Sequence, residues 1–434
     1  MILISDHFVN MANRLDIVLF GASGFTGKHC IESIDKFSSL GGSNVKWGIA
    51  GRSEYKLKQC LLDYQNKSGK DFSSIPIILA NVKDYESLKA MTAQTKVLIN
   101  CCGPYRFFGE AVIKACIETG THHVDVSGEP QFMETMQLNY NKAAQEKGVY
   151  IVSACGFDSI PADLGMNFVE KNFDGTLNSV EVYMKMDSSQ HKGPFANYGT
   201  WESLIHSLVH AHELKDLRKK LFPTRLPEFL PKLAPKPSIH KFEMTNTWNV
   251  PFMGADRSVV TRTQRYLYEK KKKRPVQIQM YFGFQSIVSI ILMGIFERIF
   301  SFLIKRNFGR ELLLKYPRFF SYGVFSHEDS IDTTKHQKCS LTFIGQGWRG
   351  QAAPEQDSSN NPPNAKIIAR LSADDPFYGL TADAVTLAAM VILEGNKLPE
   401  RGGVYTPGAV FLDTSLMDRL QKNGRLTMEV ISQT

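Results

Sequence analysis

Residues 16–30 read DIVLFGASGFTGKHC, an apolar run followed by three glycines at a spacing of three. The run has the composition of a buried β-strand, and the residues after Gly27 have that of a helix. A glycine turn between a strand and a helix lets the backbone approach a diphosphate and turns the N–H groups of the helix N-terminus toward it. The stretch therefore predicts a nucleotide-binding loop. The alternative is that the glycines only turn the chain.

The same alternation of strand and helix continues to residue 165. Each further apolar run is rich in Val and Ile and is followed by a turn signal and a helical segment, which predicts a parallel sheet with helices on both faces. Six strands in this order predict a Rossmann-type doubly wound α/β domain over residues 16–165, after an N-terminal extension over 1–15. Another α/β fold with a parallel sheet is the alternative. The five further runs are 45–51, 75–80, 96–102, 122–128 and 149–155.

The rhythm changes after residue 165, which predicts a second α/β (α+β) domain over 166–434. The segment 223–237 contains five prolines and reads as a loop or lid, and 358–364 as a turn or linker. A well-formed apolar helix ends on Gly395. Strands are expected over 179–186, 338–348 and 365–372, and this helix over 381–395.

The composition limits the classes of partner that the protein is expected to bind. The net charge of +8 favours acidic ligands or surfaces, but no nucleic-acid-binding motif accompanies it, so nucleic acid is not expected. The seven cysteines include no CxxC pair, which indicates a reduced, intracellular protein. His122 and His123 have no further ligands at metal-binding spacing, so no metal site is expected.

The end of the second predicted strand indicates which nucleotide is bound. An NAD site places an acid there for the ribose 2′-hydroxyl, whereas this chain has Arg52 and Ser53, with no acid before Glu54. A guanidinium and a hydroxyl suit a 2′-phosphate, so NADP is the predicted cofactor and NAD the alternative. Arg52 pairing with a surface carboxylate is the competing explanation. The predicted cofactor contacts are Gly21, Ser23, Gly24, Phe25, Thr26, Gly27, Arg52, Ser53, Cys102, Gly103 and Pro104.

Catalytic groups are expected where the fourth, fifth and sixth strands end, because ligands of open α/β sheets bind at that edge. Tyr105 is the first candidate for a proton donor and Arg106 for binding a substrate anion. Asp125, Glu129 and Asp158 could orient either one. The alternative for Asp125 and Asp158 is that each caps the helix that follows it.

Several segments together resemble the saccharopine dehydrogenase-like oxidoreductases of animals, and the similarity extends from about residue 15 to 430. The resemblance implies an N-terminal NAD(P)-binding domain, a following α/β domain, and association with lipid droplets, mitochondria or other membranes. The chain is more remotely similar to saccharopine reductases and to bacterial trans-acting enoyl reductases of glycolipid synthesis. The segments are GASGFTG (21–27), AGRS (50–53), NCCGPYRFFGE (100–110), DVSGEPQFME (125–134), GFDSIPADLG (156–165), VPFMGAD (250–256) and RTQRYLYE (262–269).

An uncharged stretch of 22 residues, 275–296, follows five consecutive cations at 270–274. Glu297 and Arg298 interrupt the apolar character, which resumes to residue 304. Three explanations remain open: a segment lying on a membrane or lipid droplet surface through 270–306, a bilayer span, or a helix buried in the second domain or in a homodimer interface.

Two functions follow. The first is an NADP-dependent oxidoreductase that acts on a small-molecule or lipid-like substrate, such as an intermediate of glycolipid synthesis, at a lipid droplet or another membrane, mitochondria included. The second is a non-catalytic nucleotide-binding protein of lipid droplets with a structural or sensing role. The lack of an obvious catalytic pair favours the second.

Overall fold

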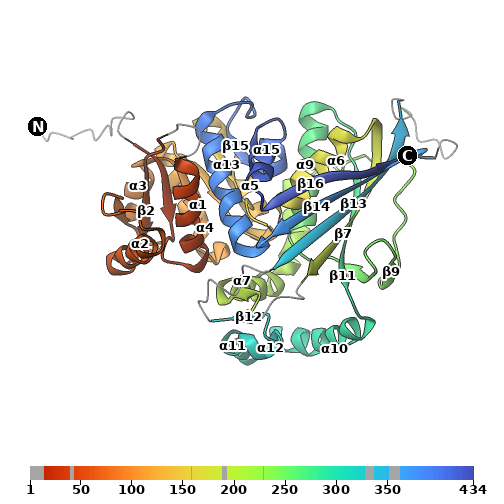
Figure 1. Ribbon diagram of the computed structural model, residues 1–434, viewed down its shortest axis with the longest axis horizontal. Helices are drawn as coiled ribbons and strands as arrows, with labels where there is room; N and C mark the ends of the chain where they lie inside the picture. The colour runs from red at the N-terminus through yellow and green to blue at the C-terminus, as the bar shows by residue number, and fades with distance from the viewer. Residues whose placement is uncertain are drawn as a thin grey trace, which may run out of the picture.

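The computed structural model describes residues 14–39, 44–157, 159–187, 193–227, 229–327, 337–350 and 362–434. Two seven-stranded sheets organise the chain, with a layer of helices beside them (Figure 1). The predicted fold class, a doubly wound parallel sheet with a second α/β domain, is confirmed. Most of the predicted extension 1–15, most of the predicted turn 358–364 and the candidate Asp158 lie outside the described residues.

The first sheet is parallel, in the order β15-β6-β5-β4-β1-β2-β3, and contains all six predicted strands. Alternate residues of β1 point to opposite faces, Ile17 and Leu19 to one core and Val18 and Phe20 to the other. The sheet is built from β1 (Leu15–Phe20), β2 (Trp47–Gly51), β3 (Ile77–Leu79), β4 (Thr95–Asn100), β5 (His122–Asp125), β6 (Tyr150–Val152) and β15 (Gly403–Tyr405).

Helices cover both faces of this sheet. The residue ranges are α1 (Phe25–Ser38), α2 (Glu54–Ser68), α3 (Tyr85–Thr92), α4 (Tyr105–Thr119) and α5 (Pro130–Lys147). A sixth helix, α13 (Thr381–Glu394), packs against α1 and against β4 and β5, although it is more than 230 residues away from these strands in the sequence.

The C-terminal part of the chain therefore returns to the first sheet, which the division at residue 165 does not anticipate. β15 pairs with β6 in parallel as a seventh strand. On α13, Asp383 accepts a hydrogen bond from the Ser33 hydroxyl of α1 (2.6 Å). It also forms an ion pair with Arg425 (3.0 Å). The nucleotide-binding unit is thus assembled from two separate parts of the chain.

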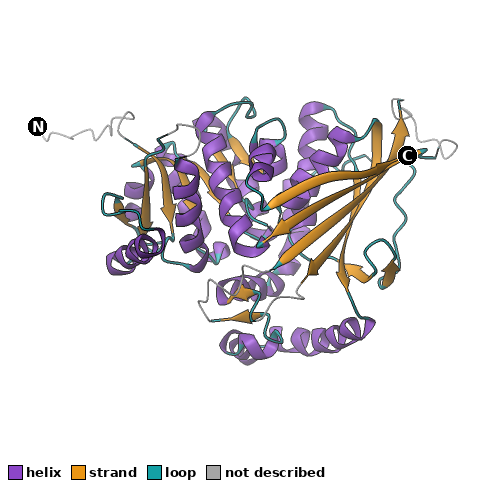
Figure 2. Cartoon of the chain, in the orientation of Figure 1, coloured by secondary structure: helices purple, strands orange, loops and turns teal. Residues whose placement is uncertain are grey.

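The second sheet has the order β16-β14-β13-β7-β11-β10-β9, and all its pairs are antiparallel except β7 with β11. Helices lie on the side that faces the first sheet (Figure 2). Gly165 of α6 packs so tightly that a Cβ there would lie 2.3 Å from the Phe343 ring. The elements are α6 (Ile160–Asn172), β7 (Gly175–Asp187), β9 (His240–Phe242), β10 (Thr247–Pro251), α9 (Asp256–Lys271), β11 (Gln277–Phe284), β13 (Lys338–Arg349), β14 (Ala365–Asp374) and β16 (Leu426–Gln433).

The apolar stretch 275–304 divides into two elements. Residues 277–284 (QIQMYFGF) form β11, which pairs with β7 on one side and with β10 on the other. Ser286 then caps α10 (Ile287–Ile304) by accepting a hydrogen bond from Val288 N. The stretch is therefore not one continuous membrane segment. The described residues of the predicted loop 223–237 contain no helix or strand.

The remaining elements form a helical layer and several short connections. The buried side chains of Trp201, Ile205, Phe300 and Leu313 hold this layer together. It comprises β8 (Ala196–Asn197), α7 (Tyr198–Val209), α10, α11 (Asn307–Lys315), α12 (Pro317–Phe320) and β12 (Phe325–Ser326). After α7, η3 (Ala211–Glu213) leads to α8 (Leu214–Leu221), which packs on α5. The elements η5 (Pro376–Leu380), α14 (Pro407–Phe411) and α15 (Leu416–Lys422) lie elsewhere.

Candidate functional site

The glycine loop joins the end of β1 to the start of α1. Gly21 has φ +84°, a left-handed conformation that favours glycine, and a Cβ there would lie 2.8 Å from the Cys102 sulfur. A Cβ on Gly27 would lie 2.3 Å from the carbonyl oxygen of Gly21. Gly24 is the extended N-cap residue of α1. Only glycine fits at Gly21 and Gly27, and the loop lies close against the helix as a result.

The N-terminus of α1 faces the carboxyl edge of the sheet. The first N–H groups of a helix have no acceptor within it, and the helix dipole favours an anion at that end. No carboxylate occupies the first turn of α1, and Gly24 has no side chain to cap it. The Phe25 ring packs edge-on against the Tyr378 ring of η5, with the ring centroids 4.5 Å apart. This arrangement can hold a diphosphate.

Arg52 lies beside the same loop. It is exposed immediately after β2, and it forms no ion pair with any residue that the structure describes. Burial raises the pKa of the Cys102 thiol, and the positive charge of Arg52 opposes that rise. Phe20 pairs with Ala50 in the parallel register of β1 and β2, so Arg52 lies at the carboxyl edge of the sheet, next to the glycine loop. Ser53 caps α2 by accepting a hydrogen bond from Lys56 N (3.4 Å).

The loop after β4 is fixed from inside. The Tyr105 hydroxyl donates to the carbonyl oxygen of Asn100 (2.9 Å), and the side chain is only 6 % exposed. Burial raises the pKa of Tyr105 well above its usual range. The structure thus places the predicted proton donor in the core, with its hydroxyl engaged by the backbone. Gly103 and Pro104 lie between it and Cys102, at the start of α4.

Glu129 holds both residues that the sequence singled out at this loop. Its carboxylate oxygens accept hydrogen bonds from the backbone N–H groups of Tyr105 and Arg106, each at 2.9 Å. Burial raises the pKa of Glu129, and these bonds and one to Ser203 oppose the rise. The Arg106 guanidinium pairs with Glu213 (2.8 Å), so it does not stand free for a substrate anion.

Asp125 links the ends of β5 and β6. Its carboxylate accepts hydrogen bonds from Ser127 N (2.9 Å), Ala154 N (3.1 Å) and the Ser153 hydroxyl (2.9 Å). It is fully buried, and burial raises its pKa to about 7. Ala154 has φ +63°, and the Asp125 contact stabilises that turn. Asp125 therefore shapes the loops at this edge and does not cap α5, the alternative stated for it.

The helix α7 covers the loop after β4, a contact that sequence reasoning missed. A Cβ on Gly103 would lie 3.9 Å from the Ser203 hydroxyl, and the His206 and Phe107 rings meet at 4.8 Å. Burial and the charge of Glu129 raise the pKa of Glu202. No local pattern could have revealed this contact, because α7 begins more than 90 residues after Gly103 in the sequence.

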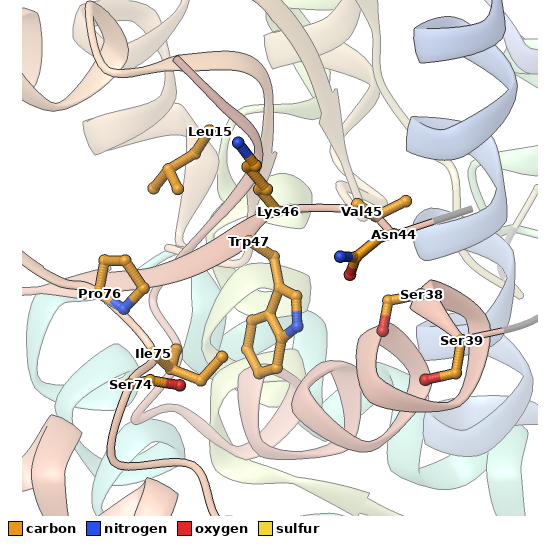
Figure 3. A pocket seen from close by; sticks show the side chains of 10 residues that line it. All are labelled: Leu15, Ser38, Ser39, Asn44, Val45, Lys46, Trp47, Ser74, Ile75 and Pro76. Carbon is orange, nitrogen blue, oxygen red and sulfur yellow. The ribbon is translucent and has the colours of Figure 1, made fainter. Parts of the chain in front are cut away.

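A hollow of about 580 Å³ lies at the opposite edge of the first sheet. Figure 3 shows its lining, with Trp47 at the centre and Leu15 and Pro76 beside it. These residues belong to the amino ends of the strands. Since ligands of doubly wound sheets bind at the carboxyl ends, this hollow is not the nucleotide site. Among the described residues, no three His, Cys, Asp or Glu side chains are grouped so as to hold a metal ion.

The comparisons with known proteins agree with this geometry. Residues 17–152 match the family model described as the saccharopine dehydrogenase NADP binding domain. A human saccharopine dehydrogenase-like oxidoreductase is 40 % identical over 96 % of this chain and 97 % of its own. The chain belongs to the saccharopine dehydrogenase-like oxidoreductases.

Other members of the saccharopine dehydrogenase-like family share nearly the full length. A Caenorhabditis elegans "Lipid droplet localized protein" is 37 % identical over 95 % of this chain and 97 % of its own. An Arabidopsis thaliana relative, named "Probable mitochondrial saccharopine dehydrogenase-like oxidoreductase", is 35 % identical over 96 % of both. Apo saccharopine dehydrogenase (L-Glu forming) from Saccharomyces cerevisiae has the same fold, with a TM-score of 0.51 and 15 % identity over 96 % of this chain and all of its own.

The residues present fit the nicotinamide dinucleotide for which the matched domain is named. The test is the N-terminus of α1, where no acidic side chain lies in the first turn and no side chain caps the helix, so it can accept an anion. The resemblance that the sequence suggested is therefore confirmed at the level of family and of cofactor class. The individual site residues remain predictions, with Tyr105 and Asp125 now seen to have structural contacts.

Proposed function

We propose that this protein is an NADP-dependent oxidoreductase that acts on a lipid-like substrate at a membrane or lipid droplet surface. The glycine loop at the N-terminus of α1 is the observation that carries the redox assignment. A bound nicotinamide dinucleotide supplies or accepts a hydride at its nicotinamide ring. The N-terminus of α1 would hold the diphosphate, and Glu129 fixes the loop over which the nicotinamide end would lie.

Arg52 supports NADP over NAD. It is an exposed cation beside the loop, with no described acidic partner, and it stands where an NAD site would have a carboxylate. A guanidinium can form two charge-assisted hydrogen bonds with a phosphate. The 2′-phosphate of NADP would supply the missing partner.

A lipid-like substrate is supported by the surface next to the site. α10 is 18 residues long with a mean hydropathy of 2.2, and only 17 % of its residues are buried. Among the described residues, one further helical stretch reaches this length and a comparable hydropathy: residues 376–394, formed by η5 and α13, which are 89 % buried and belong to the core. The C. elegans relative's name refers to lipid droplets and the plant relative's to mitochondria, so we propose a droplet or mitochondrial membrane as the location.

Cofactor binding by the full chain tests the redox assignment. NADPH should bind more tightly than NADH in a fluorescence titration. The variant Arg52→Asp should lower NADPH affinity about 10- to 100-fold, because it removes charge-assisted bonds, and leave NADH affinity nearly unchanged. Lys56→Asp, the same charge change one turn further along, is the matched control. Equal losses for both dinucleotides would contradict the 2′-phosphate assignment.

Turnover is tested with unsaturated and keto lipids presented in detergent or vesicles. Loss of NADPH absorbance that depends on the lipid would support the enzyme. A second candidate function, a non-catalytic nucleotide-binding protein, is favoured by the Tyr105 hydroxyl and the Arg106 guanidinium, which both have internal partners. NADPH binding without oxidation across the lipid panel would decide for this second function.

A further inference from the structure

The helix α10 exposes a continuous apolar stripe. Six of its side chains recur at helical spacing, and each is between 51 % and 58 % exposed. Solvent-exposed apolar patches of this extent are rare on soluble monomers and mark interaction sites. The six are Val288, Ile291, Leu292, Ile295, Ile299 and Phe302.

The apolar surface continues into the next two helices. Phe308 of α11 is 54 % exposed, and Tyr316, the C-cap residue of α11, is 47 % exposed. Phe319 of α12 is 76 % exposed. α10 contacts α11, and the three helices form one layer at the edge of the molecule (Figure 1). The layer is 287–320, and we refer to it as the α10–α12 layer.

The α10–α12 layer carries more positive than negative side chains. Residues 287–320 contain six Lys and Arg side chains and two acidic ones. Arg298, Lys305 and Arg306 form no ion pair with any residue in the described part of the chain. The Arg306 guanidinium lies over the Phe302 ring (3.7 Å), which joins charge and apolar surface at one spot. An apolar stripe with unpaired cations beside it complements an anionic lipid leaflet.

The cations at 270–274, which the sequence placed beside the apolar stretch, lie elsewhere. The eight residues of β11, roughly 26 Å of extended strand, separate them from α10. Lys271 pairs with Asp413 (2.5 Å) and Lys273 with Glu170 (3.1 Å). The charge beside the exposed apolar stripe of α10 therefore comes from the α10–α12 layer itself.

The inner side of the layer lies against α7. Trp201 and Ile205 of α7 pack on Phe300 and Leu313, and the Trp201 indole donates to the Leu313 carbonyl oxygen (2.8 Å). The opposite side of α7 covers the Gly103 loop through Ser203. One helix thus separates the apolar layer from the loop assigned to the nicotinamide.

We propose that the α10–α12 layer lies flat on a leaflet that contains anionic lipid, and that the substrate is an amphiphile taken from that leaflet past α7. The substrate part rests on the proposed function, whereas the docking part does not. A span is disfavoured because 18 helical residues reach about 27 Å, less than the ~30 Å hydrocarbon core, and because Glu297 and Arg298 lie mid-helix. Packing of Phe300 on α7 also holds α10 to the body.

Flotation of the full chain with vesicles tests the docking. Vesicles of phosphatidylcholine and phosphatidylserine should carry the protein, and binding should weaken as salt is raised. Ile291→Asp with Ile295→Asp should abolish flotation, because it places two charges in the apolar stripe. Lys305→Gln with Arg306→Gln should weaken binding about 25-fold, since each cation near an anionic surface contributes about fivefold.

Matched controls keep the result specific. Leu62→Asp with Leu79→Asp alters two apolar side chains that are 47 % and 53 % exposed on the nucleotide-binding unit, and it should leave flotation unchanged. Lys270→Gln with Lys272→Gln removes two cations from the other basic run and should also have no effect. Thermal melting and NADPH titration of each variant report folding and cofactor binding separately from docking.

Several results would overturn the proposal. Flotation unchanged by the stripe substitutions would assign binding to another surface. A dimer in solution that these substitutions dissociate, without vesicle binding by the wild type, would show that a second copy covers the layer. Binding that is insensitive to salt and to phosphatidylserine would contradict the anionic leaflet. If the wild-type protein did not bind NADPH, that result would contradict the proposed function and leave the docking result intact.

Discussion

At the scale of single residues, the conformation of the glycine loop depends on two positions that have no room for a Cβ atom. Gly21 and Gly27 leave no space for one, whereas Gly24 has only a 3.2 Å contact, to the Gly21 carbonyl oxygen. The sequence pattern already predicted this loop, because the strand, turn and helix signals are local and close together. The role of Asp125 was not predictable in the same way, because its partners Ser153 and Ala154 follow another strand. The acceptor of the Tyr105 N–H, Glu129, likewise lies 24 residues later in the chain.

Replacement of Gly27 by alanine should remove nucleotide binding. The added Cβ meets backbone that cannot rotate away, so the loop must move, and the expected loss of stability is about 1–3 kcal/mol. NADPH titration and urea unfolding measure the two effects. Gly294→Ala, in α10 with no atom within 4 Å of its Cβ, is the control: it should leave NADPH binding unchanged and should not lower stability, because alanine favours a helix by about 0.5–1 kcal/mol over glycine.

The pH dependence of stability should report Asp125. Burial raises its pKa from 3.8 to about 7, so between these values the folded state binds more protons than the unfolded state. Ionisation therefore lowers the free energy of unfolding as the pH rises through this window, by at most about 1.4 kcal/mol per pH unit. In the variant Asp125→Asn, the free energy of unfolding should depend less on pH in this window than it does in the wild type. Parallel profiles for the two proteins would show that Asp125 does not titrate there.

At the scale of elements, local periodicity predicted strands and helices well, but it could not predict which elements meet. The six strands of the first sheet and the helix ending at Gly395 are confirmed. β15 has only three residues, and its partner β6 lies about 250 residues earlier in the chain, so its signal is neither long nor local. The cap that Glu129 provides to α4 needed the same kind of long-range information.

Glu129→Ala should loosen the loop that begins α4. The N–H groups of Tyr105 and Arg106 would lose their acceptor, with an expected cost of about 1–2 kcal/mol. NADPH affinity should fall with it, because the Gly103 loop is no longer held. Glu86→Ala, in the first turn of α3, is a control of similar charge and should affect only stability, slightly. Unchanged NADPH affinity in Glu129→Ala would separate this loop from the cofactor.

At the scale of the whole molecule, the nucleotide-binding unit is completed by the C-terminal part of the chain. α13 covers β4 and β5, and nearly all its residues are buried. The buried face of the sheet would be exposed to water without it. The sequence predicted a boundary near 165 because the alternation of strands and helices stops there. It predicted the helix α13 itself, but no local pattern shows that α13 and β15 pack on the first sheet.

A fragment of residues 1–172 should therefore not fold as an independent unit. It keeps six strands but lacks α13, β15 and the Asp383 contact to Ser33. We expect a broad thermal transition and binding of a hydrophobic dye, compared with a cooperative transition of the full chain. A cooperative melt of the fragment, with NADPH bound, would contradict this division of the molecule.

The most direct test of the central claim is a crystal structure of the full chain soaked with NADP. We predict the diphosphate at the N-terminus of α1, within hydrogen-bonding distance of backbone N–H groups between Ser23 and Thr26, and the 2′-phosphate beside Arg52. A dinucleotide bound elsewhere, or a loop that remains closed to it, would contradict the nucleotide-binding site and the oxidoreductase function built on it.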